Sequence, residues 1–137
     1  MVVNSKLFRS LMKPDWTLIA NATRARLLQQ ERGAPMVILE SFIHPRGRGK
    51  PDADDHEHVE FARELAHMLE QEAQLDHFRS LTIFAVGPFL GEIRDELGKA
   101  TLRRVAGTHE LDLTSFGLSE LEQRIAHELA PHGDLIH

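Results

Sequence analysis

The feature that most constrains the fold is a short apolar segment, residues 81–86, that runs directly into a helix. The segment is rich in strand formers and is flanked by helical patterns, which is typical of a strand buried on both faces. Gly87 turns the chain, and Pro88 suits the first helical position, where its missing N–H costs nothing. An apolar stripe at three- and four-residue spacing follows and stops at Gly98. This order predicts a central strand of an α/β sheet.

Three strands are predicted before this unit. Apolar and β-branched residues concentrate in residues 15–20, 24–31 and 36–42, and short turns separate them. Strands joined by turns this short pair with their chain neighbours in antiparallel order. The first part of the domain is therefore predicted to be an antiparallel meander.

The longest helix is predicted over residues 56–76, where apolar residues recur at three- and four-residue spacing. Asp54, three residues before Glu57, has the spacing of a capping box at its start. We expect the acidic face of this helix to lie in water. That face comprises Glu57, Glu60, Glu64, Glu70 and Glu72.

Two more elements complete the pattern. Residues 101–113 contain a strand whose apolar spacing is ragged. Ser119 and Glu122 have the spacing of a capping box, which predicts that a last helix begins there. Pro131 ends that helix, because proline cannot continue it.

The predicted order is β-β-β-α-β-α-β-α, and the long helix requires a crossover between the third and fourth strands. Because crossovers between parallel strands are right-handed, few topologies remain. We predict an α/β, ribonuclease-H-like three-layer fold. Its mixed five-stranded sheet has the order 3-2-1-4-5, and the second strand runs against the other four. Residues 1–14 and 132–137 are interpreted as tails around a single domain at residues 15–131.

The composition argues against several classes of protein. The formal net charge of −5 argues against a protein that coats nucleic acid generally, although a local basic patch remains compatible with it. The absence of cysteine removes disulfides, thiolate metal sites and a cysteine nucleophile. No apolar run approaches the roughly 20 residues that span a bilayer. Residues 1–14 also lack the apolar block of a secretory signal. We therefore expect a cytoplasmic protein without a membrane span.

Four segments, in their order and spacing, resemble the bacterial host attachment protein family, whose name means a protein required for attachment to host cells. They are residues 16–28, 87–94, 110–115 and 121–125. This family is grouped with bacterial relatives of the middle domain of archaeal and eukaryotic peptide-release factors. The resemblance therefore implies the same fold as the pattern of strands and helices.

In release factors, a Gly-Gly-Gln tip lies on the loop between the third strand and the first helix. The resemblance implies that residues 44–55 occupy this position. The segment contains Arg-Gly-Arg-Gly-Lys at residues 46–50, with no adjacent glycine pair and no glutamine. Because the residue that would reach the peptidyl ester is missing, only the position of the loop is carried over. We predict no catalytic residue.

The segment 44–55 is the strongest candidate for a binding site. Three cations on a glycine-rich backbone suit contacts with phosphate groups. The alternative is a solvated loop whose cations are balanced by nearby aspartates, among them Asp52. Arg24 and Arg26 share one strand face and could join the basic patch; the alternative is that they are ordinary surface residues. The predicted residues for RNA or partner binding are Arg46, Gly47, Arg48, Gly49, Lys50, Arg24 and Arg26.

A metal site is the weaker interpretation of the same region. Asp54, Asp55, His56 and His58 offer carboxylates and imidazoles, which suit zinc or other divalent ions. On a helix, however, His56 and His58 diverge, whereas ligands four residues apart share a face. Capping and the helix dipole also account for the aspartates at a helix start. We therefore predict no metal and no cofactor.

Motifs typical of enzymes are missing from the sequence. A two-metal nuclease needs clustered carboxylates, but the first strand offers only Asp15 and residues 81–86 contain no acid. There is no nucleophile elbow, dinucleotide-binding loop or Walker-type phosphate loop. The protein is thus expected not to be an enzyme, and a hydrolase of the release-factor type is the least favoured hypothesis.

Two functional hypotheses remain. The first is a non-catalytic binding module that docks on the ribosome, on other RNA or on a protein partner through residues 44–55. The second is an attachment accessory at the cell surface, as the family name suggests. Cell fractionation separates the two.

Overall fold

The computed structural model describes residues 13–44 and 55–130, with side chains from residue 58 onward in the second range. Its centre is a five-stranded sheet in the order β3-β2-β1-β4-β5. β2 pairs antiparallel with β1 and β3, whereas β4 lies parallel between β1 and β5. The predicted strand order and the reversed second strand are confirmed. The strands are β1 (Asp15–Ala20), β2 (Arg24–Gln30), β3 (Val37–Ile43), β4 (Ser80–Ala85) and β5 (Val105–Glu110).

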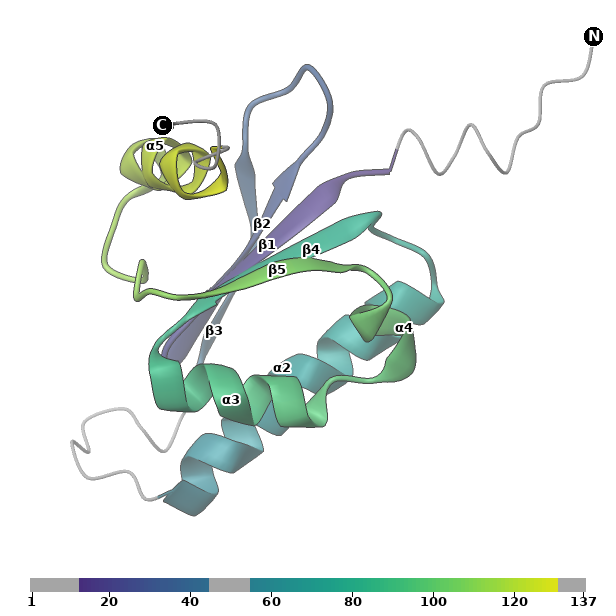
Figure 1. Ribbon diagram of the computed structural model, residues 1–137, viewed down its shortest axis with the longest axis vertical. Helices are drawn as coiled ribbons and strands as arrows, with labels where there is room; N and C mark the ends of the chain where they lie inside the picture. Colours follow the sequence, from purple (N-terminus) through teal and green to yellow (C-terminus); the bar gives the residue numbers. More distant parts are fainter. Residues whose placement is uncertain (1–12, 45–54, 131–137) are drawn as a thin grey trace, which may run out of the picture.

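Helices cover both faces of the sheet, which gives the predicted α/β fold of three layers (Figure 1). α2 (Asp55–Gln74) and α3 (Gly87–Glu96) pack on one face, together with the short α4 (Lys99–Leu102). α5 (Leu118–Leu129) packs on the other face. The sequence pattern does not predict α4, because a helix of four residues is too short to show an apolar period.

The sheet separates two apolar cores of unequal size. The larger core lies between the sheet and the layer of α2 and α3, and it includes Leu18, Leu65 and Ile83. The smaller core lies under α5, whose own buried side chains are Leu121 and Ile125. Successive residues of β4 serve both cores, so the prediction of a strand buried on both faces is confirmed. The smaller core consists of Ile19, Leu28, Met36, Phe84, Leu113, Leu121 and Ile125.

The predicted capping box of the last helix is wrong. Gly117 is the N-cap residue of α5, and no side chain caps this end. Ser119 lies inside the first turn, and the carboxylate of Glu122 accepts a hydrogen bond from the backbone N–H of Met36 at 3.2 Å. Glu122 therefore ties α5 to the chain just before β3. The box predicted at Asp54 lies outside the described residues.

The sequence pattern predicts that Glu70 lies in water. In the structure it instead caps α4. Its carboxylate accepts hydrogen bonds from the backbone N–H of Thr101 at 3.0 Å and of Ala100 at 3.3 Å. The hydroxyl of Thr101 adds a third hydrogen bond at 2.9 Å. These bonds, the one from the Thr101 N–H above all, outweigh burial and lower the pKa of Glu70 to about 2. α2 thus supplies the N-terminal cap of another helix.

Candidate functional site

The predicted binding segment starts at the carboxyl end of β3, at the same edge of the sheet as the carboxyl ends of β1 and β4 (Figure 1). Residues 45–54 lie outside the described residues. The roles proposed for these positions stay predictions, namely those of Arg46, Gly47, Arg48, Gly49, Lys50 and Asp54.

His44 is the first residue of this segment and anchors its start to the domain, so we call it the root of the segment. Its backbone N–H donates to the carbonyl of Thr23 at 2.9 Å. The His44 ring is buried and stacks on Phe61, with 5.3 Å between the ring centroids. Phe61 stacks in turn on Phe89 at 5.8 Å. Among the described residues, neither ring nitrogen of His44 has a hydrogen-bond partner, so its backbone hydrogen bond and its stacking on Phe61 of α2 hold this residue in place.

Arg24 and Arg26 share a strand face, as predicted, but the structure holds them differently. Arg24 is exposed and pairs in register with Ile43, which places its cation beside the root of the segment. Arg26 is partly buried, and its guanidinium donates to the carbonyl of Phe116 at 2.8 Å and to that of Thr114. Arg24 is therefore well placed to extend a patch at residues 44–55, whereas Arg26 holds the connection between β5 and α5.

A polar network fills the edge of the sheet at the carboxyl ends of β1 and β5. The Asn21 side chain accepts from the backbone N–H of Arg24 at 3.0 Å and donates to the hydroxyl of Thr114 at 3.0 Å. That hydroxyl donates to Asp112 at 2.6 Å. Burial raises the pKa of Asp112, but hydrogen bonds from Thr114 and Asn21, with the charge of Arg24, outweigh burial and hold this pKa below its usual value. These groups satisfy one another, so the network is structural.

The network leads to a first prediction. Arg26→Met keeps most of the side-chain length but leaves two backbone carbonyls without their donor. We expect the free energy of unfolding to fall by about 1–2 kcal/mol, as measured by urea denaturation. Arg24→Met, on the same face of the same strand, should change it by less than about 0.5 kcal/mol. Equal stability of the two variants would show that Arg26 does not hold the connection.

The proposed metal ligands gain no support from the described residues. α2 begins at Asp55, so Asp55, His56 and His58 lie in its first turn, with the two histidines two residues apart. Within residues 13–44 and 58–130, no cluster of three or more acidic or histidine side chains could hold a metal ion. The prediction that these weak candidate ligands bind no metal stays untested, because Asp54 and the side chains of Asp55 and His56 lie outside the described part of the chain.

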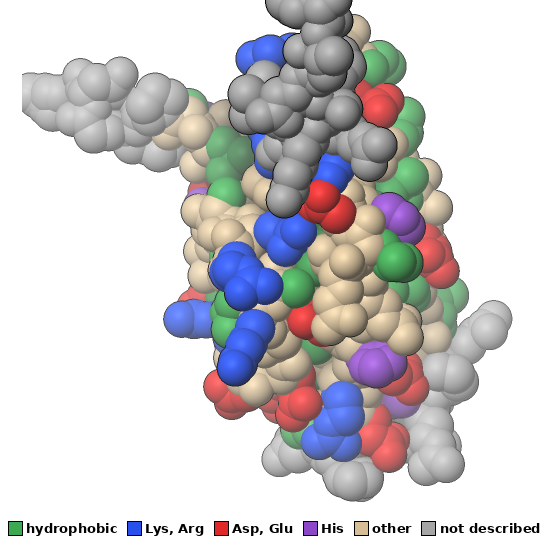
Figure 2. All heavy atoms as spheres, turned by 90° about the vertical axis from the view of Figure 1, so that its right-hand side faces the viewer, with side chains coloured by type: hydrophobic (Ala, Val, Ile, Leu, Met, Phe, Trp, Pro, Cys, Tyr) green, Lys and Arg blue, Asp and Glu red, His purple; other side chains and the backbone are tan. Residues whose placement is uncertain are grey.

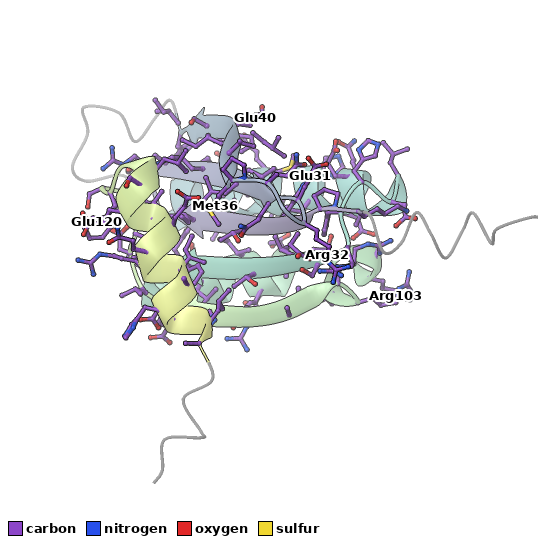
Figure 3. The ribbon with its side chains drawn as sticks, turned by 90° about the horizontal axis from the view of Figure 1, so that it is seen from above. Glu31, Arg32, Met36, Glu40, Arg103 and Glu120 are labelled. Carbon is purple, nitrogen blue, oxygen red and sulfur yellow. The ribbon has the colours of Figure 1, made fainter. Side chains whose placement is uncertain are left out.

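The structure contains a second candidate site, at the opposite end of the sheet. A hollow of about 490 Å³ opens on the α5 face at the amino ends of β1 and β4. α5 crosses the strands near their other ends, and the last turns of α5 form one wall of this hollow (Figure 3). Thr17 and Thr82 are register partners on β1 and β4, and they form part of the hollow's floor. Gly107 continues this row on β5 and adds no side chain that would fill the space.

Charged residues line the outer end of the hollow. Arg79 Nη2 donates to Asp15 Oδ2 at 2.7 Å, and the hydroxyl of Ser80 donates to Asp15 Oδ1 at 2.6 Å. The hydrogen bond and the charge of Asp15 raise the pKa of Arg79. A smaller hollow of about 230 Å³ shares Asp15 and Arg79 and is also lined by Lys13 and Arg32. Lysine and arginine side chains are prominent on this side of the molecule (Figure 2).

This hollow was not predicted from the sequence, although the sequence contains a signal for it. Asp15 and Thr17 lie two residues apart in one strand, and Ser80 and Thr82 lie two apart in the next. Residues two apart in a strand share a face, and these strands are predicted to be neighbours. Polar pairs at the start of two central strands therefore indicate a polar surface there, which the apolar character of residues 81–86 hides.

One family model matches more than half of the chain. It is described as "Protein required for attachment to host cells", and it matches residues 48–125. No curated protein matches the chain.

Solved structures of similar fold include translation factors. A structure described as "Archaeal protein" superposes with a TM-score of 0.57 at 14% identity, over 90% of this chain and 36% of that one. The archaeal translation termination factor aRF1 superposes with a TM-score of 0.53 at 14% identity, over 92% of this chain and 39% of that one. Dom34 of S. cerevisiae is a translation termination-like factor involved in RNA quality control. It superposes with a TM-score of 0.51 at 12% identity, over 87% of this chain and 36% of that one. The chain thus spans well under half of each solved chain, and identities this low show a shared fold alone.

Proposed function

The chain belongs to the family of proteins required for attachment to host cells, and from this membership we propose that it is a non-catalytic binding module. We propose that it contacts RNA, in the first place ribosomal RNA, through residues 44–55 in the cytoplasm. The observation that carries the proposal is the place of this segment in a release-factor-like fold. It leaves the sheet beside the exposed cation of Arg24. The likeness to the translation factors aRF1 and Dom34 supports RNA as the partner.

The chemistry of the segment suits binding without catalysis. Arg46, Arg48 and Lys50 provide three cations, and Arg24 adds a fourth near the root. Such cations contact phosphate groups, which position a protein on RNA without reading its sequence. The segment contains no glutamine that could act on a peptidyl ester. A release-factor-like hydrolase is therefore the least favoured alternative.

A charge-neutralising variant tests the RNA contact. Arg46→Gln, Arg48→Gln and Lys50→Gln together should lower the affinity for ribosomal RNA by roughly tenfold or more near 0.15 M salt, because three phosphate contacts are lost. The slope of log affinity against log salt should become shallower by about 2 to 3. Fluorescence anisotropy with a labelled RNA, over a series of salt concentrations, measures both quantities.

A second triple variant controls for the change in net charge. It combines Arg63→Gln, Lys99→Gln and Arg103→Gln, three exposed positions on and beside α2 and α4. This variant should bind RNA with nearly the affinity of the wild type. If both triple variants bind equally well, residues 44–55 do not form the contact.

The family description favours a second candidate, an attachment accessory that acts at the cell surface through a protein partner. Within the described residues, the helices are too short or too polar to cross a membrane. Cell fractionation distinguishes the candidates: recovery with ribosomes supports the RNA-binding module, and recovery with the envelope supports the accessory. A pull-down from native lysate then identifies the partner.

A further inference from the structure

Thr17 and Thr82 line the larger hollow. Both residues are only 7% exposed. Within the described part of the chain, neither hydroxyl makes a hydrogen bond to another residue. Neither hydroxyl oxygen is among the fully buried unpaired atoms, so both reach the space of the hollow and can exchange hydrogen bonds with a molecule that enters it. Two such groups side by side at a hollow are therefore available to a ligand.

The walls of the hollow offer complementary groups. Gln30 on β2 and His109 on β5 each can donate and accept hydrogen bonds, and the carboxylate of Glu128 on α5 only accepts. Ile125 and Leu129, also on α5, add apolar surface on the same side. A planar heterocycle with donors and acceptors on its edge and apolar faces suits this combination.

The lining of the adjoining smaller hollow combines the cations Lys13, Arg32 and Arg79 with the carboxylates of Asp15 and Glu31, so positive charge is in excess there. Arg79 uses Nε and Nη2 to bind Asp15, which leaves the N–H groups of Nη1 for another acceptor. Arg32 is exposed, and no ion pair joins it to another described residue. Lys13, the third cation, is paired with Asp76. Figure 3 shows Arg32 at the ends of the strands that α5 does not cross.

We propose that the two hollows form one binding site for a nucleoside monophosphate. The base and ribose lie over Thr17 and Thr82, and the phosphate lies between Arg32 and Arg79. The larger hollow, at about 490 Å³, falls in the range of roughly 300–1,000 Å³ that small-molecule sites occupy. The smaller one, at about 230 Å³, accommodates the phosphate.

This site is independent of the proposed RNA contact. It lies at the amino ends of β1 and β4, whereas residues 44–55 begin at the carboxyl end of β3. The triple variant at Arg46, Arg48 and Lys50 should therefore bind nucleoside monophosphates as the wild type does. If the test of one site fails, the proposal for the other site is unaffected.

Isothermal titration calorimetry of the full chain tests the proposal. The probes are the four ribonucleoside 5′-monophosphates, the corresponding nucleosides and inorganic phosphate. We expect at least one monophosphate to bind with a Kd below about 1 mM. Its nucleoside should bind more weakly, and inorganic phosphate should bind most weakly of the three, since each occupies only part of the site.

Two variants separate the parts of the site. Thr17→Val with Thr82→Val removes both hydroxyls but keeps the β-branched shape, and it should weaken monophosphate binding by roughly tenfold or more. Arg32→Gln should reduce the affinity for the monophosphate towards that of the nucleoside, and leave nucleoside binding unchanged. Thr108→Val is the matched control, because Thr108 pairs with Ile83 and lies on the other face of the sheet. Thermal denaturation verifies that each variant is folded.

Three outcomes would overturn the proposal. The first is that no monophosphate binds below about 1 mM. The second is that the folded double threonine variant binds as tightly as Thr108→Val. The third is that inorganic phosphate binds as tightly as the monophosphates, which would mean that the site selects an anion alone.

Discussion

Phe84→Ala is expected to lower the free energy of unfolding by about 3–5 kcal/mol and to detach α5 from the sheet. Phe84 is fully buried on the interior strand β4, in the small core beneath α5. α5 contributes only Leu121 and Ile125 as buried side chains, so few other contacts compensate for the cavity. Since a domain of this kind is stable by only about 5–15 kcal/mol, the loss is a large share of the total.

Urea denaturation measures this loss, and hydrogen exchange locates it. In Phe84→Ala, the backbone amides of α5 should exchange faster relative to those of α2, which packs on the opposite core. Phe42→Ala is the matched control, because Phe42 is only partly buried on the outer strand β3 and should cost less. A loss below about 1 kcal/mol for Phe84→Ala, or uniform exchange in all helices, would contradict the two-core description.

Glu70→Ala is expected to lower the free energy of unfolding by about 2–3 kcal/mol at pH 7, because it leaves the N-terminal donors of α4 without an acceptor. The donors are the N–H groups of Ala100 and Thr101 and the Thr101 hydroxyl. Gly98→Ala should act in the same direction with a smaller effect. A Cβ at Gly98 would lie 2.4 Å from the Glu70 carboxyl carbon and displace the carboxylate.

The pH dependence of Glu70→Gln isolates the carboxylate charge. The pKa of Glu70 falls from 4.5 to about 2 on folding. A lowered folded-state pKa means that the contribution of Glu70 to stability is fully present above its unfolded pKa and disappears as pH falls through its folded pKa. The stability difference between wild type and Glu70→Gln should therefore be largest near neutral pH and shrink as the pH falls from about 5 to 2.

Urea denaturation over this pH range is the measurement. Glu64→Gln on the same helix is the control, because Glu64 is exposed and should show little difference from wild type at any pH. A stability difference for Glu70→Gln that does not change with pH would mean that the charge does not hold the cap.

The candidate sites could be predicted from the sequence only in part. The cations at residues 46–50 stand out because they are contiguous in the chain, and the alternation of Arg24 with Arg26 places both on one face. The different fates of these two arginines could not be predicted. The carbonyls that bind Arg26 belong to Thr114 and Phe116, about ninety residues later, and backbone carbonyls leave no mark in a sequence. The nucleotide-sized hollow depends likewise on where α5 crosses the sheet.

The sequence by itself determined the strand order and the layering, because apolar runs of strand length and a long amphipathic helix admit few right-handed topologies. Residues 81–86 were sufficient to place β4 in the interior of the sheet, where it lies between β1 and β5. Only the tertiary structure decided the start of α5, the existence of α4 and the hollow at the amino ends of β1 and β4. The physical reason is that Glu122 and Glu70 serve partners 86 and 31 residues away. Local patterns report which face of an element is buried, whereas such hydrogen bonds form only after the layers have packed.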